Sequence, residues 1–538
     1  MSAIELGSEN FQNQLNVANG VKVSVNGGMS SELLRPIVET FMDVLSTSTG
    51  RATHYNSREE QELLEKQAHE QMFAYNRNIY GALLSLPGTL ERAQQVGIFR
   101  LLADRTDNGI CVVEGADNLD ESMILKLISN ISVPRQLKTF LKLKENRVNN
   151  ARARRIVLTS ILDVDNLEHR AVTYRKKYES LLRHFVGHKK MVVIKEILSK
   201  SEDDRLPHEV RFVNAEIARY AKSVDFDKLS LCVAFIMGSE NEFIENKSHS
   251  KCPKIASYIG AKVDLNRGQF LTPEVLEGIR SRFHPEQTKE RVLQLTAKNM
   301  TDRQRMRSAK RTESARVDVA FNPRNLTAVE LYVYALERGM TSEIAAELDA
   351  KGKLAGAEFP VKFSKVAVVV DKSQSMTGTD TNKNRPYAVA MAMKDALIHT
   401  GSESVVEVAG GGEAFGDISG DTSLSESLVN ALLAEPDVVY VITDGYENAP
   451  AGRFAQTVGR VRELGIQTPI YQLSPVSGAE ASGVRKLSND VLAMPVSDSK
   501  ALGMPFLKGM LKTNAVEAVR QLASLSLSKN QFLKLENA

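Results

Sequence analysis

Five oxygen-bearing side chains in the last third of the chain are spaced as ligands of one divalent cation. Asp371 ends the apolar run KVAVVVD, Ser373 and Ser375 follow it at alternate positions, and Asp444 directly follows VVYVIT. Thr422 offers a further hydroxyl from the loop between these two runs. Carboxylate, hydroxyl and water oxygens suit a hard cation such as Mg²⁺, which keeps several waters and takes few charged ligands. The sequence therefore predicts a Mg²⁺ site with these five ligands.

Two other aspartate loops are excluded by the same residues. An EF-hand loop starting at Asp371 needs Gly at its sixth position and Glu at its twelfth, where this chain has Met376 and Asn382. A phosphotransfer D-x-D motif needs a carboxylate where Ser373 stands. The order D-x-S-x-S also differs from the G-x-S-x-G of a hydrolase nucleophile, and the chain contains neither a P-loop nor HExxH. We therefore expect no catalytic residues and no enzyme activity. The remaining alternative is that these side chains only cap helices and turns.

The elements that must position the cation ligands are predicted to form an α/β domain over residues 361–514. Short β-branched runs alternate with helical stretches, which is typical of a doubly wound parallel sheet covered by helices on both faces. Such sheets bind ligands at the carboxyl ends of their strands, so both aspartates are expected at one edge. The predicted strands are 365–371, 404–410, 438–444, 468–474 and 491–496, and the predicted helices are 386–399, 424–433, 453–464 and 502–512.

Residues 1–358 are predicted to form a separate all-α domain, with a helical pattern from about residue 58 to 350. Segments such as AVTYRKKYESLLRHF carry apolar residues at three- and four-residue spacing, and prolines mark breaks between them. Stacked helix pairs in a solenoid would bury these apolar stripes, and so would a compact irregular bundle. Periodicity leaves both arrangements open. Residues 515–538 resume helical spacing as a tail that could pack on the first domain.

Positive charge is concentrated in one part of the helical region. The chain has a net charge of +3, but residues 131–200 contain 17 basic and 6 acidic residues, a net of +11, whereas residues 361–538 have a net of −2. Such a concentration is typical of a surface that binds a polyanion, although solvated helix faces can be equally basic. Side chains in this stretch that could contact RNA phosphates, sugars or base edges are Arg147, Asn150, Arg152, Arg155, Arg175, Lys176, Arg183 and Lys189.

Cysteine usage and hydropathy indicate a cytoplasmic protein. Cys111, Cys232 and Cys252 lie far apart without paired spacing, which fits reduced thiols. The first residues show no basic segment followed by an apolar run, and the apolar runs of the chain are far too short for a membrane span. Aromatic residues make up only 6% of the chain and Trp is absent, which argues against aromatic platforms for base stacking.

Three segments resemble the metal-ion-dependent adhesion site of von Willebrand factor A domains. They are DKSQSMTGTD, GDT and VITDG, and they contain all five motif positions in the family's order. In that family the cation keeps an open position for an acidic group of a partner. A helical region joined to such a domain resembles the Ro autoantigen family of TROVE-domain proteins. The segments that carry this second resemblance are RVNNARARRIVLTSIL, YRKKYESLLRHFVGHKK and VDVAFNPRNLTAVELYVYALERG.

The TROVE resemblance implies a HEAT-like helical-repeat ring that holds single-stranded RNA 3′ ends in a basic central hole and small noncoding Y RNAs on its outer surface. It implies a role in RNA maturation, quality control or decay, with an exoribonuclease as a partner, and a chain that is monomeric apart from the ribonucleoprotein. It adds His188 to the RNA-binding candidates, although VGHKK stands where the family has W-S-H-K-D. A zinc site at His184 and His188 is not favoured, since no Cys or carboxylate stands nearby at ligand spacing. The alternative function is a metal-dependent module that recruits an acidic partner protein.

Overall fold

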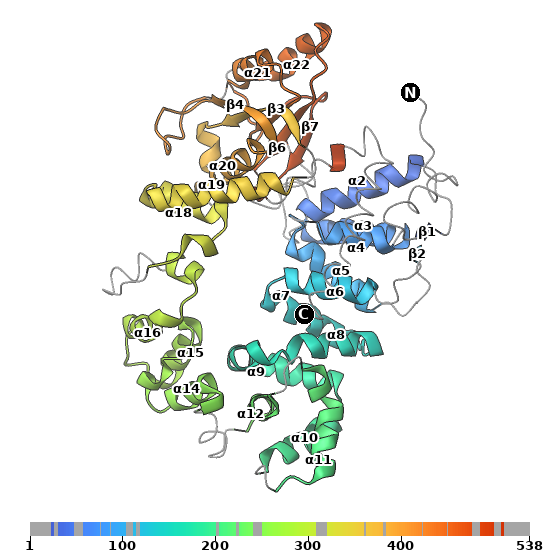
Figure 1. Cartoon of the computed structure of the whole chain (residues 1–538), viewed down its shortest axis with the longest axis vertical. Coiled ribbons are helices and arrows are strands. Elements are labelled where there is room, and N and C mark those ends of the chain that lie inside the picture. Colours follow the sequence, from blue (N-terminus) through green and yellow to red (C-terminus); the bar gives the residue numbers. More distant parts are fainter. Residues whose placement is uncertain are drawn as a thin grey trace. The chain divides into compact units, whose positions relative to one another are not determined.

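The fold is mostly helical, with a parallel sheet of five strands in the C-terminal part (Figure 1). This confirms the predicted fold class at the level of a helical region plus an α/β domain. The chain divides into two compact units, a sheet unit within residues 1–97, 106–131 and 326–538 and a helical unit within residues 98–105 and 132–325. The computed structural model describes residues 23–25, 31–47, 57–75, 77–86, 88–103, 111–113, 119–200, 204–221, 225–239, 250–307, 320–359, 362–379, 383–421, 423–448, 450–475, 485–499 and 507–509.

The helical unit is organised around α9 (Val164–Phe185), a long helix with a kink at Tyr174, where φ is −127° and ψ is 27°. Buried side chains of α9, among them Leu167, Tyr178, Leu181 and Phe185, pack on helices from before and after it in the chain. The helices in contact with α9 are α7 (Val133–Glu145), α8 (Ala151–Ile161), α10 (His188–Ser199), α12 (Phe226–Ile236) and α14 (Pro253–Ala261). The unit is completed by α11 (Pro207–Glu216), α15 (Pro273–Phe283) and α16 (Lys289–Thr296), with short 3-10 turns at 218–220, 265–268 and 297–299.

Prolines set the starts of several of these helices. The first turns of α7, α11, α14 and α15 contain Pro134, Pro207, Pro253 and Pro273, respectively. Proline is tolerated there because the first N–H groups of a helix have no intrahelical acceptor, and its fixed φ already suits the helix. The breaks that the sequence predicts at these prolines are therefore confirmed as helix starts.

The N-terminal part of the sheet unit contains short antiparallel strands and a set of helices. The strands β1 (Val23–Val25) and β2 (Cys111–Val113) pair with each other, so the helical pattern predicted from about residue 58 to 350 is wrong at β2. Buried aromatic rings hold α2 against its neighbours: His69 hydrogen-bonds the Tyr80 hydroxyl through Nδ1 at 2.7 Å, and Phe41 lies against both rings. The helices are α2 (Ser31–Thr47), α3 (Arg58–Tyr75), α4 (Arg77–Leu84), the start of α5 (Glu91–Ala103), whose residues 98–103 belong to the helical unit, and α6 (Leu119–Asn130).

The sheet has the order β4-β3-β5-β6-β7 and all its neighbouring strands are parallel. The strands are β3 (Phe363–Asp371), β4 (Gly401–Ala409), β5 (Val438–Ile442), β6 (Ile470–Ser474) and β7 (Leu492–Pro495). The chain leaves β3 for β4 on one side and returns to β5 on the other side. The carboxyl ends of β3 and β5 therefore form the topological switch point at which open sheets bind ligands.

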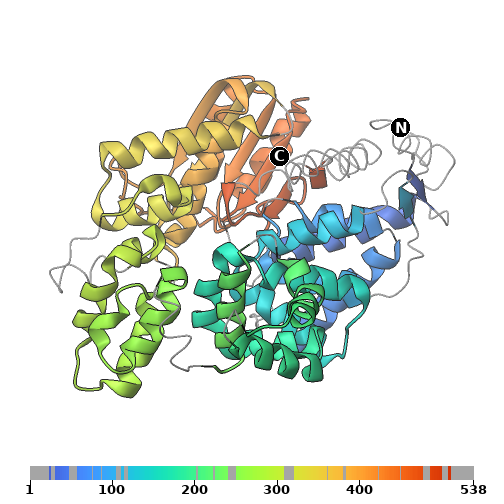
Figure 2. The same ribbon diagram turned by 60° about the horizontal axis from the view of Figure 1, so that its bottom comes forward.

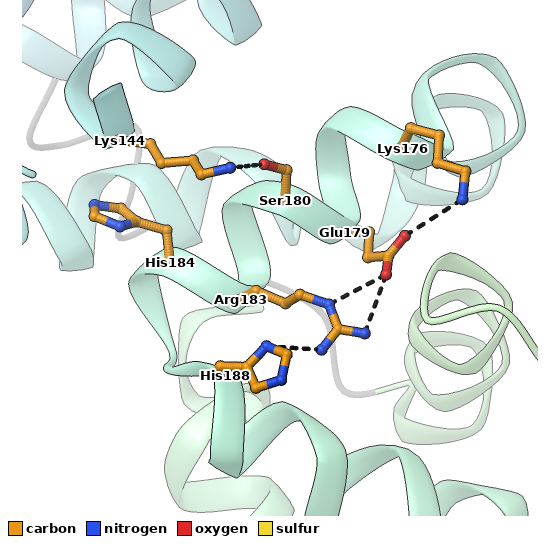
Figure 3. Close-up of a pocket in the computed structure, with 7 residues that line it drawn as sticks. All are labelled: Lys144, Lys176, Glu179, Ser180, Arg183, His184 and His188. Atoms are coloured by element: carbon orange, nitrogen blue, oxygen red, sulfur yellow. Dashed lines mark hydrogen bonds and ion pairs between the residues drawn. The ribbon is translucent and has the colours of Figure 1, made fainter. Parts of the chain in front are cut away.

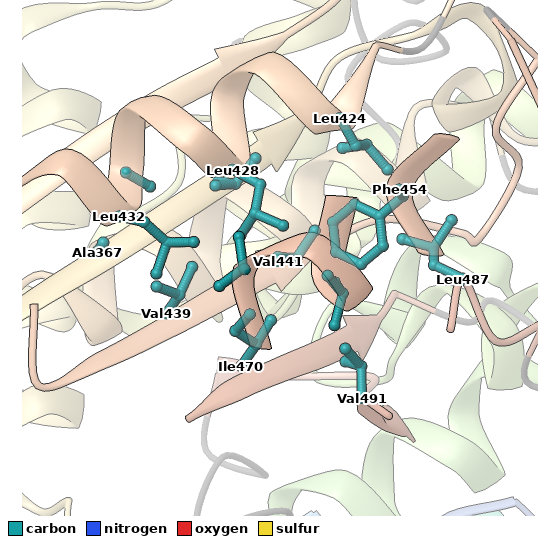
Figure 4. Close-up of a cluster of buried hydrophobic side chains, with 14 of the residues drawn as sticks. Ala367, Leu424, Leu428, Leu432, Val439, Val441, Phe454, Ile470, Leu487 and Val491 are labelled. Atoms are coloured by element: carbon teal, nitrogen blue, oxygen red, sulfur yellow. The ribbon is translucent and has the colours of Figure 1, made fainter. Parts of the chain in front are cut away.

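One face of the sheet packs on α21 (Leu424–Leu433) and α22 (Arg453–Glu463). Figure 4 shows Leu424, Leu428 and Phe454 from these helices packed over Val439 and Val441 of β5. Val405 of the edge strand β4 packs against this cluster, whereas Val406 and Val408, on the opposite face of β4, are 42% and 54% exposed. For the described residues, the predicted cover of both faces thus fits β3 and β5 and fails at β4.

The other face is covered by α20 (Arg385–Leu397), on which α18 (Ala328–Arg338) and α19 (Ser342–Ala357) pack, seen in yellow in Figure 2. Glycines allow the close approach of α19: a Cβ at Gly352 would lie 2.9 Å from the Asp395 carbonyl oxygen, and one at Gly356 would lie 2.7 Å from the Ala396 oxygen. Tyr332 of α18 donates its hydroxyl to Asp395. Helices predicted as the end of the all-α domain thus pack on the α/β domain; the boundary at 358–361 stays a prediction.

Some predictions fall on other parts of the chain. The tail 515–538, most of the predicted helix 502–512 and Thr422 lie outside the described residues; only residues 507–509 of that helix are described, and they are helical. No helix among the described residues is both long and apolar enough to cross a membrane.

Candidate RNA-binding pocket and cation-binding edge

A polar stripe runs along the exposed side of α9. Lys176, Glu179, Ser180 and Arg183 are spaced three and four residues apart, so they share one face of the helix. The intervening residues Tyr178, Leu181 and Leu182 are buried and fix the rotation of α9. The alternation of buried and polar positions in YRKKYESLLRHF thus decides which basic side chains reach solvent together.

This stripe forms the floor of an open cavity of about 480 Å³. Lys144 at the end of α7 and His188 at the start of α10 complete the lining with His184, so three helices contribute (Figure 3). The lining contains three cations and one carboxylate, a surplus of two positive charges before His188 is considered. The cavity is therefore an electropositive pocket, and we call it the α9 pocket.

Glu179 orders the cations of the α9 pocket. Its carboxylate accepts from Nε of Arg183 at 3.1 Å and lies 3.9 Å from Nζ of Lys176. Nη1 of Arg183 lies 3.0 Å from Nδ1 of His188, as Figure 3 shows. Because a guanidinium can only donate, Nδ1 of His188 must accept, and the neutral ring then carries its proton on Nε2. Arg183 therefore sets the tautomer of His188 and gives it a donor on the other side of the ring.

Two further contacts fix the wall of the pocket. Lys144 donates to Oγ of Ser180, which ties the end of α7 to the middle of α9. His184 lies 2.9 Å through Nε2 from the Val148 carbonyl oxygen and packs edge-on against Phe185. Asn149 donates to the His184 carbonyl oxygen at 2.8 Å. These bonds hold the α7–α8 turn against α9, so the position of Lys144 does not depend on its own long side chain alone.

The structure brings some of the predicted RNA-binding residues together and disperses others. Lys176, Arg183 and His188 line the α9 pocket, and Lys189 is exposed directly after His188. Arg147, in the turn between α7 and α8, and Arg155, on α8, are also exposed, whereas Arg152 is half-buried.

Asn150 and Arg175 have structural roles. Asn150 is the N-cap of α8, accepting from the Ala153 N–H and donating to the Leu102 carbonyl oxygen, both at 2.8 Å. Arg175 donates to the Phe235 carbonyl oxygen at 2.7 Å and stacks on the Phe235 ring. Capping and stacking explain both side chains without RNA, so their predicted contacts with RNA have the weakest structural support.

Sequence reasoning missed Lys144, Glu179 and Ser180. The helical spacing of Glu179 and Ser180 with Arg183 was a usable signal, because residues at i, i+3 and i+4 share a face. Lys144 lies 32 residues before Lys176 in the chain. Only the packing of α7 on α9 brings it into the pocket.

The second candidate site is the carboxyl edge of β3 and β5. Asp371 is fully buried; its Oδ2 accepts from the Thr443 hydroxyl at 2.6 Å and its Oδ1 from the Ser373 N–H at 2.9 Å. Burial raises the pKa of Asp371 to about 6; the hydrogen bonds from Thr443 and Ser373 oppose this rise, and the charge of Asp444 adds to it. A carboxylate held in this way gains from a cation placed beside it.

The other predicted ligands are arranged around Asp371. The hydroxyls of Ser373 and Ser375 are 3.2 Å apart, and Asp444 is half-buried with Oδ1 accepting from the Tyr446 N–H at 3.1 Å. All of these donors are hard oxygens on the switch-point loops, so the residues present fit Mg²⁺. Ser373, Ser375, Asp371 and Asp444 are the described residues that would hold it. A cation there would supply a positive charge at the sheet edge.

Sequence reasoning also missed two residues that support this edge. Thr443 is fully buried, and its hydroxyl accepts from the Gly445 N–H at 3.1 Å while donating to Asp371. Lys372 is buried and donates to the carbonyl oxygens of Gly412 and Ala414, which anchors the loop after β4 beside Ser373. The run VVYVITD contained Thr443, but its inward direction depends on the register of β5 with β3.

Within the described part of the chain, no three His, Cys, Asp or Glu side chains come together as a metal site. The carboxyl edge of β3 and β5 is not such a cluster, because only two of its candidate ligands, Asp371 and Asp444, are carboxylates. The serine hydroxyls supply the remaining protein oxygens. His184 and His188 do not act together: the first binds the Val148 carbonyl and the second binds Arg183.

Comparisons of the sequence with models of known protein families and with curated proteins found no match.

Proposed function

We propose that this protein is a non-catalytic RNA-binding scaffold and that the α9 pocket binds phosphates of the RNA backbone. The observation that carries the proposal is the convergence of Lys144, Lys176, Arg183 and His188 on one open cavity. These side chains come from the stretch of the chain with a net charge of +11. Phosphate oxygens are pure acceptors, and every one of these side chains can donate.

Glu179 has a defined part in this proposal. By holding Arg183 on Nε, it leaves the guanidinium in one orientation, with Nη1 toward His188. An ordered guanidinium loses less conformational entropy when a phosphate binds. Nε2–H of His188 is then a neutral donor beside it. Such contacts position an RNA backbone without reading its bases, which suits a scaffold that accepts several small RNAs.

The resemblance to TROVE-domain proteins extends this proposal to specific RNA classes. On that basis the basic outer surface binds small noncoding Y-like RNAs, and a helical-repeat ring holds single-stranded 3′ ends of structured or misfolded RNAs in its central hole. The protein would then assist RNA maturation, quality control or decay, with an exoribonuclease as partner. The helical unit, with its helices stacked around α9, is compatible with helical repeats.

The test is direct binding of a small structured RNA with a single-stranded 3′ tail, measured by fluorescence anisotropy at several salt concentrations. Binding should weaken with salt with a log–log slope of about −0.7 for each phosphate neutralised on a single strand. Charge reversal at Lys144 and Lys176 should reduce affinity and flatten this slope. The matched control reverses Lys353 and Arg460, two exposed side chains of the sheet unit, for the same change in net charge. Equal losses in both double variants would reduce the interaction to bulk charge and contradict the proposal.

The cation edge favours a second function, a metal-dependent protein-interaction module. The supporting observation is the buried Asp371 beside the paired hydroxyls of Ser373 and Ser375 and the carboxylate of Asp444. Addition of Mg²⁺ at 100 times its Kd should raise the free energy of unfolding by about 2.7 kcal/mol. Asp444→Asn should abolish this thermal shift, and Asp490→Asn, an exposed aspartate before β7, should leave it unchanged. A stabilisation that persists in Asp444→Asn would place the cation elsewhere.

A further inference from the structure

An exposed arginine stands beside the cation edge on a part of the chain far from the motif. Cζ of Arg485 lies 3.6 Å from the centre of the Tyr446 ring. Tyr446 is 50% exposed, and its backbone N–H is the group that binds Asp444 at 3.1 Å. The Arg485–Tyr446 stack is therefore attached directly to one of the candidate cation ligands.

The position of Arg485 is fixed by buried groups. Nε2 of Gln472, a fully buried residue on β6, donates to the Arg485 carbonyl oxygen at 2.8 Å, and its Oε1 accepts from the Leu487 N–H at 3.0 Å. Gly445 has φ +84°, and a Cβ there would lie 2.3 Å from the same carbonyl oxygen. Glycine at 445 thus allows the loop to approach the edge, and Gln472 holds it there.

The guanidinium of Arg485 is available for a ligand. Among the described residues, Arg485 forms no ion pair, and Glu447, which directly follows Tyr446 in the chain, accepts instead from the Phe454 N–H at 2.9 Å. Stacking on an aromatic ring uses the face of a guanidinium and leaves the N–H groups at its rim free to bind a carboxylate as a fork. The ring also holds the side chain in place before a ligand arrives, which reduces the entropy lost on binding.

We propose that Arg485, stacked on Tyr446, is a second anion anchor beside the cation, and that the two together bind an acidic peptide segment carrying neighbouring carboxylates. This inference rests on the proposed cation site. The cation takes one carboxylate and Arg485 takes another, so Arg485 selects for segments with more than one acidic residue.

Charge around the edge favours an acidic peptide over RNA. The loop after β4 carries Glu413, Asp417 and Asp421, and the Gln374 N–H binds its Gly420 carbonyl oxygen at 3.2 Å, which places the loop beside the ligands. Residues 361–538 have a net charge of −2. A polynucleotide with a charge on every nucleotide would meet these carboxylates, whereas two side-chain carboxylates need only the two local positive charges.

The experiment uses the full chain, Mg²⁺, and blocked fluorescent peptides with alternating glutamates, a single glutamate, or glutamines. The wild type should bind the alternating-glutamate peptide in Mg²⁺ more tightly than the other two. Arg485→Ala should weaken that binding about tenfold or more, as expected for loss of a charge-assisted pair, while Mg²⁺ affinity and binding of the single-glutamate peptide stay the same. Arg485→Lys should give an intermediate loss because it keeps the charge without the fork. The contact that holds the loop uses the backbone of Arg485, so the fold is retained in both variants.

The control is Lys486→Ala, which removes the exposed charge next in the chain and should leave peptide binding unchanged. Equal binding by Arg485→Ala and wild type would overturn this inference while leaving the cation site standing. Absence of any Mg²⁺ binding by the wild type would overturn the cation site and this inference together. A loss in Arg485→Ala of binding to a short oligouridine, with the peptides unaffected, would overturn the choice of partner.

Discussion

The α9 pocket and the carboxyl edge of the sheet are built by opposite means. At the pocket, exposed side chains of three helices converge, and their charges are ordered by one another, as in the pair of Glu179 with Arg183. At the edge, a fully buried carboxylate is held by a buried hydroxyl, from strands whose register fixes both. The pocket can therefore lose charges without loss of folding, whereas changes at the edge alter stability and binding at once.

The largest expected effect is on RNA binding at the pocket. Lys176→Glu with Arg183→Glu should weaken binding of a small structured RNA about 100-fold at moderate salt, because each reversal removes a charge-assisted contact and adds repulsion. The midpoint of thermal unfolding should move little, since both side chains lie at the surface. Anisotropy titrations and calorimetry on one preparation check both. A large fall in Tm would break the contrast between pocket and edge.

The next largest expected effect is on stability, through the close packing of α19 on α20. Gly356→Ala should destabilise the protein by about 2.5 kcal/mol, since its Cβ would meet backbone atoms of α20, including the Ala396 oxygen at 2.7 Å, that cannot move aside. Urea unfolding measures the change. Gly459→Ala is the matched control: nothing lies within 4 Å of its Cβ in α22, and the better helix propensity of Ala should stabilise by up to about 1 kcal/mol. Similar losses for both would contradict the close approach of α19.

Thr443→Val tests whether the edge couples stability to cation binding. The change keeps the shape of the side chain and leaves Oδ2 of the buried Asp371 without its 2.6 Å hydrogen bond, which should lower the free energy of unfolding by about 2 kcal/mol. Urea unfolding with and without Mg²⁺ gives the measurement. Mg²⁺ should recover part of the loss, because a cation also satisfies a buried carboxylate. Thr457→Val is the control: its hydroxyl bonds the Arg453 carbonyl oxygen at an exposed position of α22, so neither effect is expected.

The smallest effects separate the histidines of the pocket. His188→Ala should weaken RNA binding a few-fold without changing stability, because the ring is exposed and its hydrogen bond is with the partly exposed Arg183. His184→Ala should instead lower stability by about 1 kcal/mol through loss of the bond to the Val148 carbonyl. Anisotropy titrations and urea unfolding of both variants distinguish the RNA-binding role of His188 from the structural role of His184. The reverse pattern would mean that His184, and not His188, faces the RNA.

Local patterns in the sequence were sufficient to predict the individual helices and strands. The predicted helix over AVTYRKKYESLLRHF is confirmed within α9 except for the kink at Tyr174. The predicted strands are confirmed within a few residues, and α21 is found at 424–433 as predicted. These succeed because periodicity and β-branched runs act over a few residues. Cys232 and Cys252 show the limit: they are 20 residues apart without a motif, yet both are buried with Sγ atoms 3.9 Å apart.

The sequence by itself determined a helical region followed by an α/β domain, the helical spacing of Lys176 and Arg183 on α9, and the placement of Asp371 and Asp444 at the ends of two apolar strands. Each follows from spacing within one element. Tertiary structure alone decided that Lys144 and His188 join the polar stripe on α9, that Asn150 and Arg175 serve as a cap and a stack, and that Thr443 and Arg485 stand beside the aspartates. The physical reason is that a pocket or an edge depends on how helices pack and how strands register, and these contacts join residues far apart in the chain.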